Sequence, residues 1–184
     1  MNKKFIIVDD FYDIAHMYHK SFFEEAKEIN PQELPLKISS LLNISGQVEQ
    51  KVIIDAAFNE NRFENSPNPI VANPTYDWIG VIYLTLPPDC ISKTGLRFYT
   101  HTKTGLDAFP NEYARKINGW QNIEDIQSSF NGSNSSNWES YSSIYVKYNR
   151  LVLFRSDLWH SYGIGFGTEL NNSMMYQKLL IKNG

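Results

Sequence analysis

The histidines are the side chains of this chain best suited to bind a metal ion or to move a proton near neutral pH. The most informative of the four is His160, which ends the apolar stretch 150–160 and precedes three glycines, Gly163, Gly165 and Gly167. Glycine lets the backbone turn sharply, so an imidazole at this strand end suits a metal ligand at the mouth of a barrel. The alternative is a structural histidine whose ring nitrogens are hydrogen-bonded in the core.

The other reactive side chains have weaker signals. His101 ends the stretch 95–101, where it would either donate a hydrogen bond into a pocket or face a loop. His16 and His19 share one face of a predicted helix and, without a third ligand nearby, are interpreted as a surface pair. Cys90 is the single cysteine and cannot form an internal disulfide, which is typical of a reducing compartment.

Hydrophobic periodicity predicts the elements that position these side chains. One helix is expected from Asp13 to about Asn30, where Pro31 follows, and a second in part of residues 110–128, around 113–117. The segment 31–50 receives no assignment. Seven segments have strand character: 5–8, 51–58, 78–84, 95–101, 141–148, 151–154 and 174–181. About seven strands with one or two helices predict a single domain over residues 1–184, a β barrel or sandwich with helices outside.

Composition excludes several classes of protein. A net charge of -3 argues against a nucleic-acid or membrane-surface binder, which usually carries a basic patch. The apolar run near the start is too short for a signal peptide, and no run approaches the roughly 18 apolar residues of a membrane helix. These features predict a soluble, cytoplasmic protein without nucleic-acid or membrane partners.

Four blocks in this order resemble the iron/2-oxoglutarate dioxygenase family, in particular oxygenase-like proteins of bacteria and their phages. The blocks are Val8–Tyr12, Trp78–Leu84, Gly95–Asp107 and Asn149–Ser161, spread over most of the chain. The resemblance implies a mainly β fold: a double-stranded β-helix, also called a jelly roll or cupin-like barrel, with a few flanking α-helices.

The resemblance also implies where the family's site residues should fall. Family members hold iron with a His-x-Asp pair and a second histidine, and an arginine pairs with the carboxylate of 2-oxoglutarate. The second histidine matches His160, whereas the pair falls on Val71 and Asn73 and the arginine on Met174. Valine cannot ligate a metal, a neutral amide is a poor substitute for a carboxylate, and a thioether cannot neutralise an acid.

Other residues could take over these roles. Asp77 and His101, with His160, would make a site of two histidines and one carboxylate, and Asn73 could add a weak amide oxygen. The ordinary interpretation of Asp77 is a carboxylate that caps a loop. The candidate cofactor-binding residues are Arg97, Lys178 and Tyr99. Either cation could replace the arginine that binds 2-oxoglutarate, although each would ordinarily lie on a solvated face.

These residues leave two principal hypotheses. The first is an oxygenase that uses Fe(II) and 2-oxoglutarate to hydroxylate a small molecule or a side chain. The second is a catalytically inactive relative, a pseudoenzyme whose barrel binds a ligand or a protein partner in an apolar pocket lined by Trp78, Tyr99 and Trp159. A viral assembly protein is compatible with a jelly roll, but no feature selects it. The oligomeric state stays open.

Overall fold

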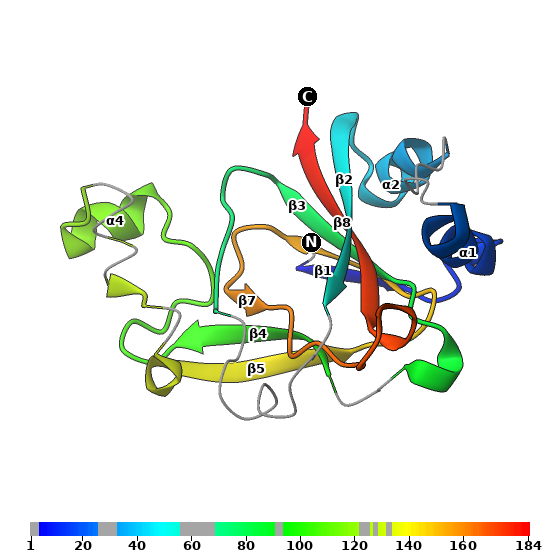
Figure 1. The fold of residues 1–184 in the computed structure, drawn as a ribbon. Helices are drawn as coiled ribbons and strands as arrows, with labels where there is room; N and C mark the ends of the chain where they lie inside the picture. Colours follow the sequence, from blue (N-terminus) through cyan, green and yellow to red (C-terminus); the bar gives the residue numbers. More distant parts are fainter. Residues whose placement is uncertain are drawn as a thin grey trace.

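Two antiparallel β-sheets face each other in the computed structural model of the chain (Figure 1). The structure describes residues 4–25, 33–55, 69–90, 94–121, 126, 129–131 and 134–184. The strands of the large sheet are, in spatial order, β1 (Phe5–Val8), β6 (Leu151–Arg155), β3 (Trp78–Tyr83), β8 (Met174–Asn183) and β2 (Gly46–Asp55).

The small sheet has the spatial order β5 (Trp138–Tyr145), β4 (Gly95–His101) and β7 (His160–Ser161). Beyond β7, Val71 forms an isolated antiparallel bridge with His160. This bridge extends the small sheet by one more residue pair on the side away from β4.

The apolar core between the sheets follows from strand alternation. Residues at every second position of β3, β6 and β8 point toward the small sheet, as expected from the pleat of a strand. Opposite them lie Leu96 and Phe98 of β4, which are fully buried. The first residue of β3 is half-buried and the other five are buried, so the predicted burial of this strand on both faces is confirmed.

Helices cover the other face of the large sheet. The helices α1 (Ala15–Glu25) and α2 (Leu34–Leu42) lie on this side, with α2 next to β2, whereas α4 (Glu112–Asn118) stands apart at the far end of the molecule (Figure 1). Leu34 and Ile38 are the residues that α2 buries. Within the described residues, no helix is long and apolar enough to cross a membrane. Short 3-10 helices occupy Pro87–Asp89, Ser135–Asn137 and Leu170–Asn172.

Several element boundaries differ from the prediction. The sequence does not predict the helix α2 or the start of β2 at Gly46, because the segment 31–50 is mixed in composition and contains two prolines. Pro35 instead lies in the first turn of α2, where a missing amide hydrogen costs no hydrogen bond. The strand β5 begins at Trp138 and ends at Tyr145, three residues before the predicted positions. The predicted ends of a helix at Asn30 and a strand at Phe58 lie outside the described residues.

The apolar stretch 150–160 is not one strand. The strand β6 ends at Arg155, a turn follows, and His160 begins β7 in the other sheet. The turn is held by backbone hydrogen bonds from Ser156 N to the Asp77 carbonyl and from Asn73 N to the Ser156 carbonyl. The sequence therefore predicted the strand character of this segment but missed its crossing between sheets.

Candidate functional site

His160 lies in the layer between the two sheets. It stands directly opposite Phe98 in the β4–β7 register, so the two side chains share the inner face of the small sheet. The imidazole is buried and packs edge-on against Phe154 of β6, with ring centroids 4.7 Å apart. The residue is thus held by contacts with both sheets.

One hydrogen bond determines the tautomer of His160. Its Nδ1 lies 2.8 Å from the Leu158 carbonyl oxygen, which can only accept, so Nδ1 carries the hydrogen. Burial lowers the pKa of His160 to about 4, and the nearby Lys178 acts in the same direction, whereas the Leu158 carbonyl opposes the shift. The ring is therefore neutral at pH 7, and Nε2 offers a lone pair.

That lone pair has no partner among the described residues. His160 Nε2 is buried without a hydrogen bond, and so is the hydroxyl of Tyr162, whose ring centroid lies 5.3 Å from that of the imidazole. Buried polar atoms in proteins nearly always have a partner, so two adjacent exceptions mark a position where a polar molecule could bind.

A lysine completes this cluster. The Lys178 ammonium lies 4.8 Å from the centre of the Tyr162 ring. Burial and the neighbouring Lys51, which stands directly opposite it in the β2–β8 register, lower the pKa of Lys178. No carboxylate of the described residues forms an ion pair with Lys178. His160, Tyr162 and Lys178 are called the inner cluster below.

Val71 pairs with His160, and Asn73 lies two residues further along the same segment. Val71 and His160 exchange two backbone hydrogen bonds of 2.9 Å, so their side chains lie on the same face. Val71 is 38% exposed, which indicates that the space beside His160 opens to solvent there. The half-buried Asn73 turns its side-chain oxygen toward the backbone N–H of Thr75, at 3.4 Å, within a local turn.

The remaining metal-ligand candidates point elsewhere. Asp77 is exposed and its carboxylate accepts a 2.8 Å hydrogen bond from the Asn183 N–H at the end of β8. His101 lies on the outer face of the small sheet, where its ring packs against Phe130 and Trp138. Burial lowers the pKa of His101, and Lys103 contributes to the shift. The structure does not bring Asp77 or His101 to His160.

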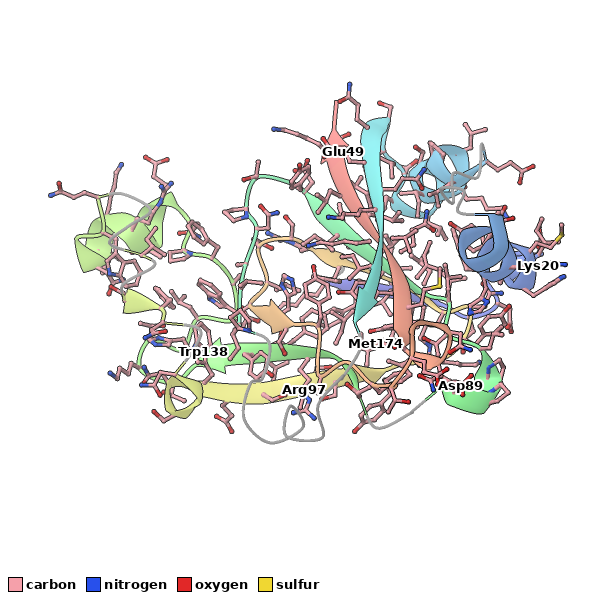
Figure 2. The ribbon with its side chains drawn as sticks, viewed as in Figure 1. Lys20, Glu49, Asp89, Arg97, Trp138 and Met174 are labelled. Atoms are coloured by element: carbon pink, nitrogen blue, oxygen red, sulfur yellow. The ribbon has the colours of Figure 1, made fainter. Side chains whose placement is uncertain are left out.

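The positions expected to bind a cofactor are divided between the layer between the two sheets and the outer face of the small sheet. Met174 is fully buried between the sheets, on the same face of β8 as Lys178. Arg97 is exposed on the outer face of β4, and Figure 2 shows it on the side of the small sheet that is turned away from Met174. Tyr99 shares this outer face and hydrogen-bonds through its hydroxyl to Ser161 Oγ at 3.0 Å.

Tyr162 was not recognised in the sequence as part of a site. The signal that could have found it is spacing, because a residue two positions after His160 returns to the same side of an extended chain. Gly163 follows directly with a φ of +79°, and a Cβ there would lie 2.4 Å from the Gly95 carbonyl oxygen. The expectation that glycines turn the backbone sharply after His160 is confirmed at this position.

The donor set beside His160 does not fit an iron site of two histidines and one carboxylate. His160 presents a suitable lone pair, but Val71 has no donor atom and Asn73 uses its oxygen locally. No group of three or more His, Cys, Asp or Glu side chains within the described ranges is placed to hold a metal ion. Lys178 could meet a carboxylate, whereas Met174 occupies the expected arginine position.

The sequence matches one protein family. The model of a family of unknown function, DUF6445, matches residues 75–175, more than half of the chain. No curated protein matches the sequence.

Solved structures share the fold. The non-heme alpha-ketoglutarate-dependent epimerase SnoN from nogalamycin biosynthesis superposes with a TM-score of 0.55 at 8% identity, over 98% of this chain and 78% of SnoN. HygX from Streptomyces hygroscopicus, with nickel, 2-oxoglutarate and hygromycin B bound, has a TM-score of 0.50 at 10% identity, over 98% and 83% of the two chains. The two antiparallel sheets are therefore a cupin or jelly-roll-like fold of the kind found in these enzymes.

Proposed function

The chain belongs to the DUF6445 family of unknown function, and we propose that its barrel binds a small hydroxycarboxylate without the three-residue iron site of the oxygenases that share its fold. The observation that carries this proposal is the inner cluster, in which two buried polar atoms have no partner, and Lys178 no carboxylate, among the residues that the structure describes. In this interpretation the protein is a catalytically inactive relative.

The chemistry of the cluster selects the ligand class. A carboxylate would accept hydrogen bonds from the Lys178 ammonium and the Tyr162 hydroxyl and would neutralise this half-buried cation. Neutral His160 can only accept at Nε2, so the ligand also needs a donor, which a hydroxyl supplies. A hydroxycarboxylate satisfies all three groups.

We also propose that the barrel is a double-stranded β-helix. Supporting this finer description, a five-stranded sheet ordered β1-β6-β3-β8-β2 faces the order β5-β4-β7, and Val71 adds a bridge beside β7. The chain is then a single domain, with the ligand near the end of the barrel at which Val71 is exposed.

Calorimetric titration with malate, succinate and 2-oxoglutarate, in the presence of a metal chelator, tests the ligand class. Malate should bind about tenfold or more tightly than succinate, because only malate has a hydroxyl to donate to His160. Lys178→Met should weaken malate binding by at least about tenfold, whereas the control Lys182→Met, which changes an exposed lysine of the same strand, should not. Absence of saturable binding by all three acids contradicts the proposal.

Restoring the expected ligands tests the second part of the proposal. The triple variant Val71→His, Asn73→Asp and Met174→Arg should acquire Fe(II) binding that the parent lacks, because Val71 already lies opposite His160. Adding His160→Ala to the triple variant is the matched control and should abolish the gain. Tight Fe(II) binding by the parent protein would overturn the metal-free interpretation.

The oxygenase hypothesis is the second candidate, and it is supported by the presentation of His160. A backbone carbonyl holds Nδ1–H and leaves Nε2 free, which is how metal-binding histidines are commonly oriented. Its iron ligands would be His160 and the amide oxygen of Asn73, because Asp77 and His101 lie away from His160. Its 2-oxoglutarate would be held by Lys178, because Arg97 and Tyr99 lie on the outer face of the small sheet. Fe(II)-dependent turnover of 2-oxoglutarate by the parent chain, lost in His160→Ala, would favour it.

A further inference from the structure

A second cavity lies outside the inner cluster, at the end of the barrel next to α4. It has a volume of about 710 Å³ and is bounded by two segments, 74–78 and 109–115, over a floor formed by residues 155–157. Both walls are fixed to the neighbouring chain by backbone hydrogen bonds, from Ser156 N to the Asp77 carbonyl and from Phe109 N to the Asp157 carbonyl. This groove is therefore built by ordered backbone on three sides.

Aromatic residues and prolines supply the apolar part of the groove. Its walls include Pro74, Tyr76, Trp78, Phe109 and Pro110. Phe109 also packs against Trp159, the residue before β7, with ring centroids 6.1 Å apart, which fixes its orientation. Flat aromatic faces in a preformed cavity suit a planar ring.

The charges of the groove select one kind of ligand. Two arginines and two aspartates line it, but Arg155 and Asp157 form a bidentate ion pair with each other. Arg115 and Asp77 remain without an oppositely charged partner among the described residues. The Arg115 Nε–H is also buried without an acceptor. One unpaired cation and one unpaired anion match a zwitterion, whereas a polyphosphate would find only one unpaired guanidinium and would be repelled by Asp77.

We propose that this groove binds a free aromatic amino acid, with the carboxylate on Arg115, the ammonium on Asp77 and the ring against the aromatic wall. This site is separate from the inner cluster and does not depend on the hydroxycarboxylate proposal. Nothing in it requires a metal ion or a cofactor.

Calorimetric titration of the full chain with L-phenylalanine tests the site. Two further ligands, each of which lacks one of the two charged groups, test the two charges separately. We expect saturable binding of L-phenylalanine, and binding at least about tenfold weaker for 3-phenylpropanoate, which lacks the ammonium, and for 2-phenylethylamine, which lacks the carboxylate.

Two variants assign the charges to residues. Arg115→Gln should weaken the binding of L-phenylalanine and 3-phenylpropanoate by about tenfold or more but leave that of 2-phenylethylamine unchanged. Asp77→Asn should weaken the binding of L-phenylalanine and 2-phenylethylamine but leave that of 3-phenylpropanoate unchanged. The amide oxygen of Asn can still accept from Asn183 N–H, so the end of β8 keeps its hydrogen bond. Lys116→Gln, an exposed change next to Arg115 on α4, is the control and should have no effect.

Three outcomes would overturn this inference: no saturable binding of L-phenylalanine, equal loss of all three ligands in Arg115→Gln, or an equal loss in Lys116→Gln. Malate binding by the Arg115→Gln variant separates the two proposals, since it should equal that of the parent even if the groove binds no amino acid.

Discussion

At the scale of single residues, the state of His160 follows from burial and one backbone hydrogen bond. The Leu158 carbonyl accepts from Nδ1, and the surrounding apolar rings exclude the water that a charged imidazole would need. The sequence identifies His160 as a candidate site residue, because it lies at a predicted strand end before glycines. Only the tertiary structure shows that its Nε2 has no partner among the described residues and that Tyr162 and Lys178 belong to the same cluster.

The neutral state of His160 predicts acid sensitivity. The imidazole has a pKa near 6.5 in the unfolded chain and about 4 in the folded protein, so the unfolded chain binds more protons between these values. The stability from neutral His160 is complete above pH 6.5 and is lost as the pH falls toward 4. Urea unfolding should show a loss on the order of 1–2 kcal/mol between pH 7.5 and 5. A His160→Asn variant should lack this component; an identical pH dependence in both proteins contradicts the assignment.

At the scale of elements, the turn between β5 and β6 is joined to the segment after β1. Asn149 in this turn adopts a φ of +58° and is buried. Its side-chain oxygen accepts from the Tyr12 N–H at 2.9 Å, and its amide donates to the Tyr12 carbonyl at 2.8 Å. Two of the sequence blocks that carry the family resemblance, 8–12 and 149–161, are thus in direct contact. Strand propensity predicts each segment but cannot predict such a contact, because the partners are 137 positions apart.

Removing the Asn149 side chain should destabilise the fold for two reasons. Asn149→Ala loses both hydrogen bonds and puts at positive φ a residue that tolerates this conformation less well than asparagine, so we expect a loss of about 2–4 kcal/mol in the free energy of unfolding. Asn149→Gly loses only the hydrogen bonds and should be less destabilised than the alanine variant. Urea denaturation of the three proteins measures both effects. If the glycine and alanine variants lose the same free energy of unfolding, the positive φ of residue 149 does not contribute to the loss.

At the scale of the whole molecule, the two sheets are held together by one apolar layer. Phe98 and Phe154 meet edge-to-face across it, with centroids 5.2 Å apart, and both are fully buried. The same Phe154 ring contacts His160, so the packing between sheets also positions the inner cluster. The stability of the fold and the position of His160 are therefore coupled through this layer.

Truncating Phe154 should lower the stability of the fold and change the surroundings of His160. Phe154→Ala leaves a cavity between the sheets and should lower the free energy of unfolding by about 3–5 kcal/mol. Tyr145→Ala, which truncates a half-exposed ring on the edge strand β5, should change stability far less. Thermal or urea unfolding measures the difference. In Phe154→Ala protein that still folds, the pKa of His160 should rise toward 6.5 as water enters, which NMR titration of the imidazole would detect.

The sequence by itself determined the β character of most segments, the helices α1 and α4 and the choice of His160 as a candidate site residue, because these depend on periodicity and residue type within short windows. Only the tertiary structure decided that 150–160 divides between two sheets, that Pro35 lies in the first turn of a helix, and that His101 and Arg97 lie on the opposite face from His160. The physical reason is that side chains alternate along a strand, so a residue's face depends on where the strand starts and which sheet it joins. Those choices are made by pairing between distant strands, and they place Lys178 over the Tyr162 ring in the layer of His160, whereas Arg97 lies on the other face of the small sheet.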